Sequence, residues 1–371
     1  MKIENEGSAR FRVDSGVFYN PQMEELRSMS VTFLKAATVK GKRILDSTAA
    51  TGIRAIRYAL EAKGTDITLL DINKKAADNA RKNVRLNGLK FKVLNDSIQK
   101  FANTHEGSFE IIDLDPFGSP APDLYDLMKI SWDGTVLMVT ATDTAVLCGA
   151  HGPACIKIYG AKPLHNEMCK EAGIRILIGY VARIAAQFNF GIVPLLSVSD
   201  RHYMRVFIRL EFGAAKAVES VKGTGIGAFC RKCYGFGFAA GAAPLISPAC
   251  DRCDERMEPF GPLWLRRLYD KKLTSKMLDI KETKLLRTIN DEFDSLMFYS
   301  IPRITSSLGL GSVSHYSVIG KLKERGRKAT ETQFDSDGVK TDASAEEVIG
   351  AVKAVHSSMA SELTTRQSRD Y

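Results

Sequence analysis

Short apolar segments alternate with segments of helical periodicity through the first half of the chain, and this alternation constrains the fold more than any other feature. A mostly parallel sheet with helices on both faces is the arrangement that buries such a pattern. We therefore predict strands at residues 43–46, 66–70, 91–94, 109–114 and 135–140, with helices at 52–62 and 73–86. Farther along, residues 163–188 are expected to be helical. Residues 193–198 and 203–210 are expected to pair as an antiparallel hairpin around a turn at 200–202.

The length of 371 residues predicts two domains. Composition turns to small and charged residues at 211–222, so we expect a first domain at 1–215 and a second at 216–371. The net charge of +9 and the pI of about 9.1 favour a polyanionic partner. The chain has no apolar run long enough to cross a membrane and opens with no signal peptide, so we expect a soluble, cytoplasmic protein.

Aspartates mark the ends of the first four predicted strands. They are Asp46, Asp71, Asp96 (followed by Ser97) and the pair Asp113 and Asp115. In open α/β sheets ligands bind beyond the carboxyl ends of the strands, which is where these acids are expected. Asp71 follows Gly52 by 19 residues, the spacing at which an acid binds ribose hydroxyls. Any one acid has the alternative role of a helix cap, but four strands share the pattern.

The segment after the first strand, residues 46–52, contains a single glycine, Gly52. It therefore lacks the three glycines of a dinucleotide-binding fingerprint. Its other residues are small, so a ligand can still approach the backbone closely. Because no third glycine packs the helix as a pyrophosphate site requires, a phosphate-free nucleoside cofactor fits better than NAD. S-adenosylmethionine is such a cofactor.

The fourth strand leads into Asp115-Pro116-Phe117-Gly118, which resembles the Asp/Asn-Pro-Pro-aromatic loop of methyltransferases that act on exocyclic amines. An exocyclic amine is a poor nucleophile because its lone pair is delocalised into the ring. An acceptor must bond its N–H and draw the nitrogen toward tetrahedral geometry. Asp115 and the carbonyl of Pro116 are the predicted acceptors, and Phe117 offers a flat face on which a base stacks.

Six motifs, taken in order, resemble those of the archaeal-type tRNA guanine-N2 dimethyltransferase family, which methylates guanine 26 with S-adenosylmethionine. They are residues 17–21, 51–57, 115–120, 140–145, 261–264 and 338–343. Each motif alone is weak, but their order and spacing are specific and run almost from end to end. The resemblance implies a Rossmann-like class I methyltransferase domain, followed by a smaller α+β domain that contains zinc and binds tRNA.

The resemblance also implies roles for individual residues. Asp115 is implied to be catalytic, with Phe117 and Phe18 sandwiching the guanine. The residues implied to contact the cofactor are Arg27, Arg54, Asp71, Asp96 and Ser97, with Asp46 near it. The chain departs from the family around Arg27, where Glu25-Leu26-Arg27-Ser28 stands in place of Asn-Arg-Asp, so the bonds of the residues beside Arg27 stay open.

Three residues have alternative interpretations. Phe18 has the alternative role of a packed strand residue, and the two roles stay equally open. Arg54 and Arg57 have the alternative role of charges on a solvated helix. Because Arg54 lies at the helix start on the cofactor side, we favour a functional role for Arg54 and a solvated charge for Arg57.

Cysteines form a second constellation, in which two C-x-x-C pairs are separated by sixteen residues. Cys230, Cys233, Cys250 and Cys253 suit a tetrahedral, structural zinc site with four thiolate ligands. The intervening segment is rich in Gly, Ala and Pro and does not easily build a core without such a link. Disulfides are the alternative, which a cytosol disfavours. The other cysteines, Cys148, Cys155 and Cys169, are expected to be buried thiols.

Residues 263–328 contain 14 Lys and Arg against 7 Asp and Glu, a net charge of +7. We predict that they form a phosphate-binding face, with a solvated helix pair as the alternative. Within this part of the chain we expect helices at 264–268 and 274–288. An amphipathic helix is expected after residue 343, followed by a polar tail at 364–371.

Three functions are consistent with these features. The first is a monomeric tRNA guanine-N2 methyltransferase that uses S-adenosylmethionine. The second is an amino-methyltransferase acting on another RNA or on DNA. The third is a non-catalytic RNA-binding protein with a methyltransferase-like fold, against which the intact Asp46, Asp71, Asp96 and Asp115 argue. Whether the product is mono- or dimethylated is left open by the sequence.

Overall fold

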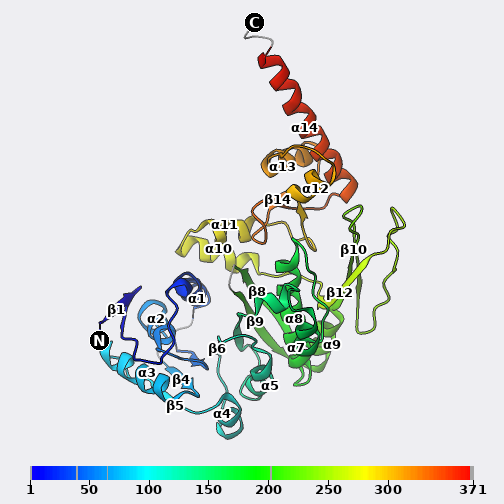
Figure 1. Cartoon of the computed structure of the whole chain (residues 1–371). Coiled ribbons are helices and arrows are strands. Elements are labelled where there is room, and N and C mark those ends of the chain that lie inside the picture. Colours follow the sequence, from blue (N-terminus) through cyan, green and yellow to red (C-terminus); the bar gives the residue numbers. More distant parts are fainter. Residues whose placement is uncertain (1, 39–40, 65, 201–202, 368–371) are drawn as a thin grey trace. The chain divides into compact units, whose positions relative to one another are not determined.

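The computed structural model describes residues 2–38, 41–64, 66–200 and 203–367, and the chain forms two compact units (Figure 1). Unit 1 contains Met1–Thr144, Tyr180–Val221 and Leu268–Thr283; unit 2 contains Ala145–Gly179, Lys222–Arg267 and Lys284–Tyr371. This division differs from the predicted domains 1–215 and 216–371. The chain does change unit near residue 221, but residues 145–179 and 268–283 belong to the unit opposite to the predicted one. Composition does not mark these two segments, because each resembles the rest of the chain.

A seven-stranded sheet forms the core of unit 1, in the order β5-β4-β3-β6-β7-β9-β8. Neighbours from β5 to β7 run parallel, whereas β9 runs antiparallel to both β7 and β8. Strands β6 and β7 are buried along their whole length, as expected when helices cover both faces. The predicted Rossmann-like fold is therefore confirmed. The strands are β3 (Arg43–Asp46), β4 (Asp66–Asp71), β5 (Lys92–Asn95), β6 (Ile111–Leu114), β7 (Val136–Ala141), β8 (Phe190–Ser199) and β9 (Met204–Phe212).

The helices between these strands lie on both faces of the sheet. The chain builds outward from β3 to β5 and then in the opposite direction from β6 to β7. Because such crossovers are right-handed, the reversal changes the face that the helices cover. Helix α2 (Ile53–Ala62) accordingly contacts α3 (Lys74–Leu86), while α4 (Ile98–Thr104) contacts α5 (Ala121–Lys129). The reversal leaves a switch point between β3 and β6, where open sheets hold their ligands.

An N-terminal segment completes this side of unit 1. A short hairpin, β1 (Glu4–Glu6) and β2 (Ala9–Phe11), precedes the 3-10 helix η1 (Pro21–Met23) and α1 (Glu24–Ala36). Helix α1 contacts α2 and also α10 (Lys271–Ile280), a helix from far along the chain. Two further helices contribute to unit 1: α8 (Cys169–Ala186) from Tyr180 onward, and α9 (Ala214–Lys222) as far as Val221.

Unit 2 contains two small antiparallel sheets (Figure 1). The first has the order β11-β10-β12, formed by Phe236–Ala240, Thr224–Phe229 and Glu258–Trp264. The second has the order β13-β15-β14, formed by Tyr299–Ser300, Gly338–Thr341 and Ala329–Glu331. Its helices are α6 (Thr144–Leu147), α7 (Gly152–Tyr159), α11 (Lys284–Asp291), α12 (Ile301–Ser307), α13 (His315–Glu324) and α14 (Ala345–Gln367). From α11 to β15 the order of helix, short strand, two helices and hairpin is that of a winged helix-turn-helix module.

Two predicted helices differ from the structure. Residues 264–268 are not helical, because Trp264 ends β12 and the chain then continues without regular structure. The helix predicted at 274–288 is two helices, α10 and α11, because Lys281 is extended and ends the first. Two further expectations fall partly outside the described residues: 201–202 of the hairpin turn and 368–371 of the polar tail. Across the described ranges, no helix is both long and apolar enough to span a membrane.

Candidate active site and metal centre

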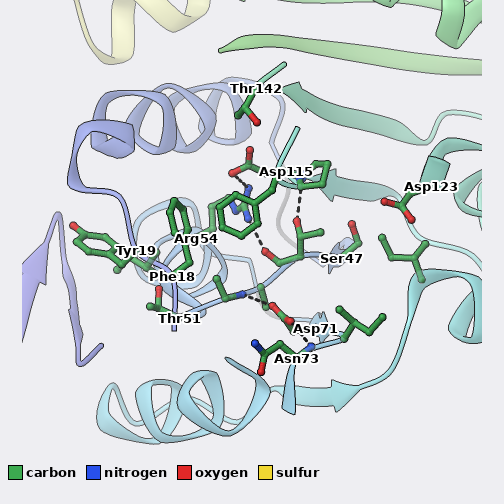
Figure 2. Close-up of a pocket in the computed structure, with 18 of the residues that line it drawn as sticks. Phe18, Tyr19, Ser47, Thr51, Arg54, Asp71, Asn73, Asp115, Asp123 and Thr142 are labelled. Carbon is green, nitrogen blue, oxygen red and sulfur yellow. Dashed lines mark hydrogen bonds and ion pairs between the residues drawn. The ribbon is translucent and has the colours of Figure 1, made fainter. Parts of the chain in front are cut away.

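A pocket of about 870 Å³ opens at the carboxyl ends of the parallel strands (Figure 2). Its walls come from the loops after β3, β4, β5 and β6 with residues of the helices that follow them, from Thr142 after β7, and from residues before and within α1. All of these residues belong to unit 1. The pocket therefore lies where the distribution of aspartates predicts a ligand site.

The loop between β3 and α2 brings backbone close to the pocket. Gly52 has φ +76°, a conformation that favours glycine, and a Cβ there would lie 3.1 Å from Leu69 Cδ2 and 3.2 Å from Ala80 Cβ. The single glycine of this loop is thus required both by its backbone and by the packing of α3 on the sheet. Ser47, Thr48, Ala49 and Ala50 line the pocket beside it.

Asp71 ends β4 and lines the pocket, as predicted. Its Oδ2 accepts a hydrogen bond from Ala50 N at 2.8 Å, and its Oδ1 accepts one from Asn73 N at 2.8 Å. A carboxylate offers about four lone-pair positions, so these bonds fix its orientation and leave positions for a ligand. The arrangement suits a group that carries two neighbouring hydroxyls.

Asp96 and Ser97 also line the pocket, but both have local partners. Ser97 caps α4 by accepting a hydrogen bond from Lys100 N, and Asp96 lies 3.2 Å from Lys100 Nζ. Ser97, and not Asp96, is thus the residue that caps α4, alongside its place in the pocket. Ile72, which no sequence motif marks, is 75% exposed and lines the same pocket.

The loop after β6 is held in place by its neighbours. Asp115 N donates to Thr48 Oγ1 at 3.0 Å (Figure 2). Gly118, with φ +75°, donates its N–H to Thr142 Oγ1 at 2.7 Å. Thr142 N in turn donates to Gly118 O at 2.9 Å. Bonds on both sides of Pro116 and Phe117 thus set the position of this loop at the pocket.

Arg54 lies behind Asp115 and joins it to two deeper acids. Arg54 Nη1 is 2.6 Å from Asp115 Oδ2 and 3.5 Å from Asp113 Oδ1, and Nη2 is 3.5 Å from Asp46 Oδ1. Asp46 and Asp113 are fully buried, whereas the Asp115 side chain is 21% exposed. Of the three carboxylates, only that of Asp115 lines the pocket. Asp46 therefore does not line the pocket itself but forms an ion pair with Arg54, which does.

The acids of this cluster titrate differently. Burial raises the pKa of Asp46 to about 6, and the charges of Asp113 and Asp115 add to the rise, against the opposing charge of Arg54. Burial also opposes ionisation of Asp113, but the charges of Arg205 and Arg54 outweigh it and lower its pKa. Arg205 lies 2.9 Å from Asp113 Oδ2, and Tyr58 Oη donates to the same oxygen at 2.5 Å. Asp113 is thus a buried anchor rather than a pocket residue.

Phe18 and Phe117 face each other at the mouth of the pocket. They are 50% and 72% exposed, and their rings meet edge to face with centroids 4.3 Å apart. Phe18 lies outside any strand, so its alternative role as a packed strand residue is excluded. Large exposed aromatic side chains are costly in water, and here two of them share one site.

Arg27 lines the pocket and is bonded to Glu6, an acid that no sequence motif marks. Arg57 also bonds Glu6 and pairs with Glu61 at 2.7 Å. Arg57 is only 3% exposed, so the prediction of a solvated charge was wrong. It is a buried structural ion-pair residue, because the acids that neutralise it lie on β1 and one turn further along α2. The local sequence around Arg57 indicates neither the burial of this arginine nor its pairing with the distant Glu6.

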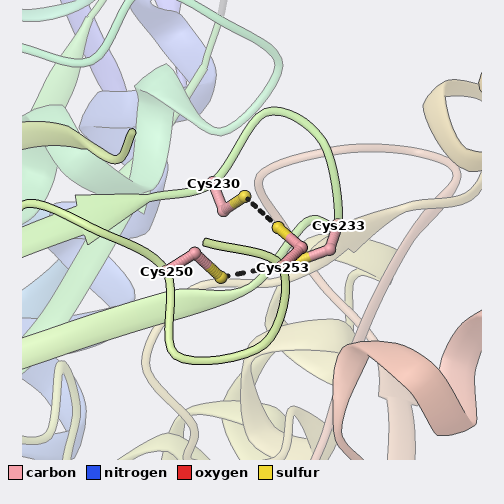
Figure 3. A group of neighbouring side chains, drawn as sticks. All are labelled: Cys230, Cys233, Cys250 and Cys253. Atoms are coloured by element: carbon pink, nitrogen blue, oxygen red, sulfur yellow. Dashed lines mark hydrogen bonds between the residues drawn. The ribbon is translucent and has the colours of Figure 1, made fainter. Parts of the chain in front are cut away.

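Four cysteines gather in unit 2 on two loops of the same shape (Figure 3). In one loop Tyr234 N donates to Cys230 O at 3.0 Å, and in the other Asp254 N donates to Cys250 O at 2.9 Å. Tyr234 and Asp254 both have positive φ, which turns each loop back on itself. The two loops therefore present their thiols in the same way.

The four sulfur atoms all lie within 4.8 Å of one another. The Cys230–Cys253 and Cys233–Cys250 separations are 3.5 and 3.4 Å. A tetrahedral zinc ion with Zn–S bonds of about 2.3 Å separates its sulfur ligands by about 3.8 Å, so the thiols fit this metal. Few apolar residues support the loops: Ala228, Met257 and Ile246 are their main neighbours. All four positions are filled by protein thiols, as in a structural zinc site.

The remaining cysteines only partly match the expectation of buried thiols. Cys155 is fully buried, whereas Cys148 and Cys169 are half-buried and hydrogen-bonded to each other. The bond from Cys148 is the main cause that lowers the pKa of Cys169 to about 7. Neither residue belongs to the metal cluster or the pocket.

Known proteins match this chain along almost its whole length. Residues 1–353 match the family described as N2,N2-dimethylguanosine tRNA methyltransferase. A tRNA (guanine(26)-N(2))-dimethyltransferase of Methanobrevibacter smithii is 35% identical over 361 residues, which is 93% of each chain. The protein of the same name from Pyrococcus horikoshii is 37% identical over 369 residues, covering 92% of this chain and 93% of its own.

A solved structure of Trm1 from Pyrococcus horikoshii, in complex with S-adenosyl-L-methionine, has the same fold. It superposes with a TM-score of 0.86 at 34% identity and covers 95% of this chain and 99% of its own. The resemblance that the six sequence motifs indicate is thereby confirmed. The chain belongs to the N2,N2-dimethylguanosine tRNA methyltransferase family.

Proposed function

We propose that this protein transfers two methyl groups from S-adenosylmethionine to the exocyclic N2 of guanine 26 in tRNA. The observation that carries the proposal is the placement of Asp115. Its carboxylate is held by Arg54 on one side, faces a nucleoside-sized pocket, and lies in a loop whose Phe117 is exposed. The names of the relatives support the choice of tRNA and of guanine 26.

The cofactor fits the polar groups of the pocket. Asp71 has two backbone bonds and free lone pairs, which suits the two ribose hydroxyls of an adenosine. Ile72 provides an apolar surface for the adenine ring, with Asp96 and Ser97 beside it. Arg27 is the cation that we assign to the carboxylate of the methionine part, and Arg54 and Asp46 adjoin the same end through their ion pair. When bound, the cofactor supplies an electrophilic methyl group on a sulfonium.

Asp115 is the group that we assign to the guanine amine. Oδ2 is engaged by Arg54, which leaves Oδ1 to accept a hydrogen bond from the N2–H, together with Pro116 O. As the new N–C bond forms, the S–C bond breaks with its electron pair staying on sulfur, and N2 becomes positively charged. The Asp115 carboxylate stabilises this charge until N2 loses a proton. A monomethylated N2 still has one N–H, so the same group serves the second transfer.

The two phenylalanines form the slot for the base. A guanine ring is flat, and stacking on an aromatic side chain is worth about 1–3 kcal/mol. Phe18 and Phe117 now touch edge to face at 4.3 Å, a separation too small to admit a ring between them. Entry of the base therefore requires one of the two exposed rings to turn, which the open surroundings of Phe117 permit.

We further propose that tRNA is bound through phosphates by the basic residues of the C-terminal third. Arg266, Arg267, Lys271 and Lys272 are all exposed. The exposed face of α13, in the winged helix-turn-helix module, adds Lys323. The zinc ion is given a structural role, the protein is expected to act as a monomer, and tRNA as a substrate favours a cytoplasmic location.

The test is the analysis of nucleosides from tRNA treated with the protein and S-adenosylmethionine. We expect N2,N2-dimethylguanosine to accumulate after a transient of the monomethylated nucleoside. Methylation of other RNA or of DNA at a higher rate than tRNA would favour an amino-methyltransferase with another substrate. Binding of tRNA with no methylated nucleoside at all would favour the non-catalytic protein.

A further inference from the structure

Glu6 is a buried carboxylate in the N-terminal hairpin, outside the seven-stranded sheet. It is 2% exposed and is the last residue of β1. Burying a carboxylate is costly unless charged and polar partners compensate it. A hairpin of three-residue strands has little stability of its own, so it does not need an acid at this position for its own sake.

Three side chains fill the hydrogen-bonding capacity of this carboxylate. Arg27 Nε lies 2.7 Å from Oε1 and Arg27 Nη2 lies 2.5 Å from Oε2. Arg57 Nη1 donates to Oε1 at 2.8 Å, and Tyr19 Oη donates to Oε2 at 3.0 Å. Four donors match the four lone-pair positions of a carboxylate. Burial would raise the pKa of Glu6, but the bonds and charge of Arg27, with the bonds from Arg57 and Tyr19, lower it.

Two of these three partners, Arg27 and Tyr19, line the pocket. Arg27 receives a further constraint, because its Nη2 also donates to Asn20 O at 3.1 Å. Its Nε and Nη2 are thus committed, and among the described residues Nη1 has no hydrogen bond. Because a guanidinium is planar, fixing one edge fixes the direction of the other. Glu6 therefore determines where the remaining donor of Arg27 points.

Tyr19 carries the constraint from Glu6 to the base slot. Its hydroxyl is bonded to Glu6, its ring packs edge to face on Phe11 at 4.8 Å, and Arg27 Cζ lies 5.2 Å from its ring centroid. Phe18 is the preceding residue and meets Phe117 at the pocket mouth. A Tyr19 side chain fixed at both ends holds the backbone from which Phe18 projects.

We propose that Glu6 is a positioning residue for both halves of the reaction site: it orients Arg27 toward the cofactor and, through Tyr19, holds Phe18 opposite Phe117. This inference rests on the proposed function. Glu6 touches neither reactant, since it does not line the pocket.

The chain offers a matched control in Glu61. Glu61 also accepts hydrogen bonds from Arg57, at 2.7 and 3.2 Å, and one from Ser8 N at 3.2 Å. Its described bonds do not include Arg27 or Tyr19. Glu6→Gln and Glu61→Gln thus each remove a negative charge that pairs with Arg57. Only Glu6→Gln also changes the hydrogen bonds of the pocket residues Arg27 and Tyr19.

The experiment measures S-adenosylmethionine affinity by calorimetry, the single-turnover methylation rate at saturating cofactor, and the thermal unfolding midpoint. For Glu6→Gln we expect cofactor affinity to fall about tenfold and the saturated rate to fall about tenfold, because charge-assisted bonds are lost. Glu61→Gln should lower the unfolding midpoint while both other values stay within about twofold. Equal effects of the two substitutions on affinity and rate would overturn the proposal, since a structural role alone predicts that outcome.

Tyr19→Phe keeps every charge and tests the second half separately. It should leave cofactor affinity unchanged and lower the saturated rate about threefold to tenfold, and adding it to Glu6→Gln should lower the rate no further. A wild-type rate for Tyr19→Phe would overturn the link to Phe18. This test remains decisive even if Glu6→Gln does not fold. If the wild-type protein itself methylates no tRNA, the proposed function fails, and the calorimetric comparison still decides the orientation of Arg27.

Discussion

Asp115 is preorganised by contacts to three segments of the chain. Its N–H donates a hydrogen bond to Thr48, and its carboxylate forms an ion pair with Arg54. Three residues later in the same loop, Gly118 N donates a hydrogen bond to Thr142. A group that is already in place pays little reorganisation when charge develops on the substrate. Asp115 is therefore expected to act mainly on the rate of methyl transfer rather than on tRNA binding.

Asp115→Asn and Asp115→Ala should both lose most of the methyl-transfer rate, by a factor of about 10² to 10³. Asn keeps the shape and one acceptor oxygen but lacks the charge that stabilises the developing cation and pairs with Arg54. Single-turnover kinetics measure the effect, and tRNA affinity within a few-fold of wild type is the control. A near wild-type rate for Asp115→Asn would reduce Asp115 to a neutral acceptor, and one for Asp115→Ala would move the catalytic role elsewhere.

Asp71→Ala should weaken S-adenosylmethionine binding by at least about tenfold, because each hydrogen bond from a ribose hydroxyl to a carboxylate is worth about 1.5–3 kcal/mol. The substitution also removes the bonds to Ala50 N and Asn73 N. Asp71→Asn is the matched variant, since it keeps one acceptor for these amides. Calorimetry that finds the same affinity for Asp71→Ala as for wild type would remove Asp71 from the site.

Residues of the pocket could be predicted from sequence where a local pattern accompanied them. Asp71 and Asp115 each end or follow a recognisable strand, and the structure places both in the pocket. Glu6 and Arg205 had no such signal, because their partners lie far along the chain: Arg57 is 51 residues from Glu6, and Asp113 is 92 residues from Arg205. The prediction that Arg57 is a solvated charge was wrong for the same reason, because its partner Glu6 is distant in the sequence.

Elements were predictable where periodicity alone decides them. The parallel strands and the β8–β9 hairpin follow from apolar runs that a buried sheet requires. Residues 264–268 appeared helical, but pairing of β12 with β10 keeps the start of this segment extended. The break between α10 and α11 at Lys281 has no proline or glycine to mark it, so tertiary context rather than local propensity ends the first helix.

The two cysteine loops should hold about one zinc ion per chain. Cys230→Ser and Cys253→Ser should lower the metal content and destabilise this part of unit 2, because metal-binding free energy there is folding free energy. Metal analysis and thermal unfolding check both effects, with Cys155→Ser, a buried cysteine outside the cluster, as the control. Freshly purified protein without bound metal would contradict the assignment.

The chain passes between its two units more often than composition indicates. Residues 145–179 lie within the predicted first domain but belong to unit 2. Residues 268–283 lie within the predicted second domain but belong to unit 1. The basic segment at 263–328 is divided in the same way, with α10 in unit 1 and α11 to α13 in unit 2. Charge along a sequence predicts an electrostatic partner but not which unit presents it.

Neutralising Arg266, Arg267, Lys271 and Lys272 together should weaken tRNA binding and reduce its salt dependence. Each lost phosphate contact lowers the slope of log affinity against log salt by about one. Arg267 also pairs with Asp294 at 2.7 Å, so its substitution removes this ion pair as well. Four exposed lysines outside the segment, Lys35, Lys63, Lys90 and Lys92, serve as the control. An unchanged slope would make the segment a solvated face.

The pocket is proposed to deliver methyl groups to the exocyclic amine of one guanine. The most direct measurement is methyl incorporation into two tRNA transcripts that differ only at position 26, one with guanine and one with hypoxanthine, which lacks the 2-amino group. We expect two methyl groups on the guanine transcript and none on the hypoxanthine transcript, with both transcripts bound equally well. Equal methylation of the two transcripts would show that the acceptor is not the N2 of that base.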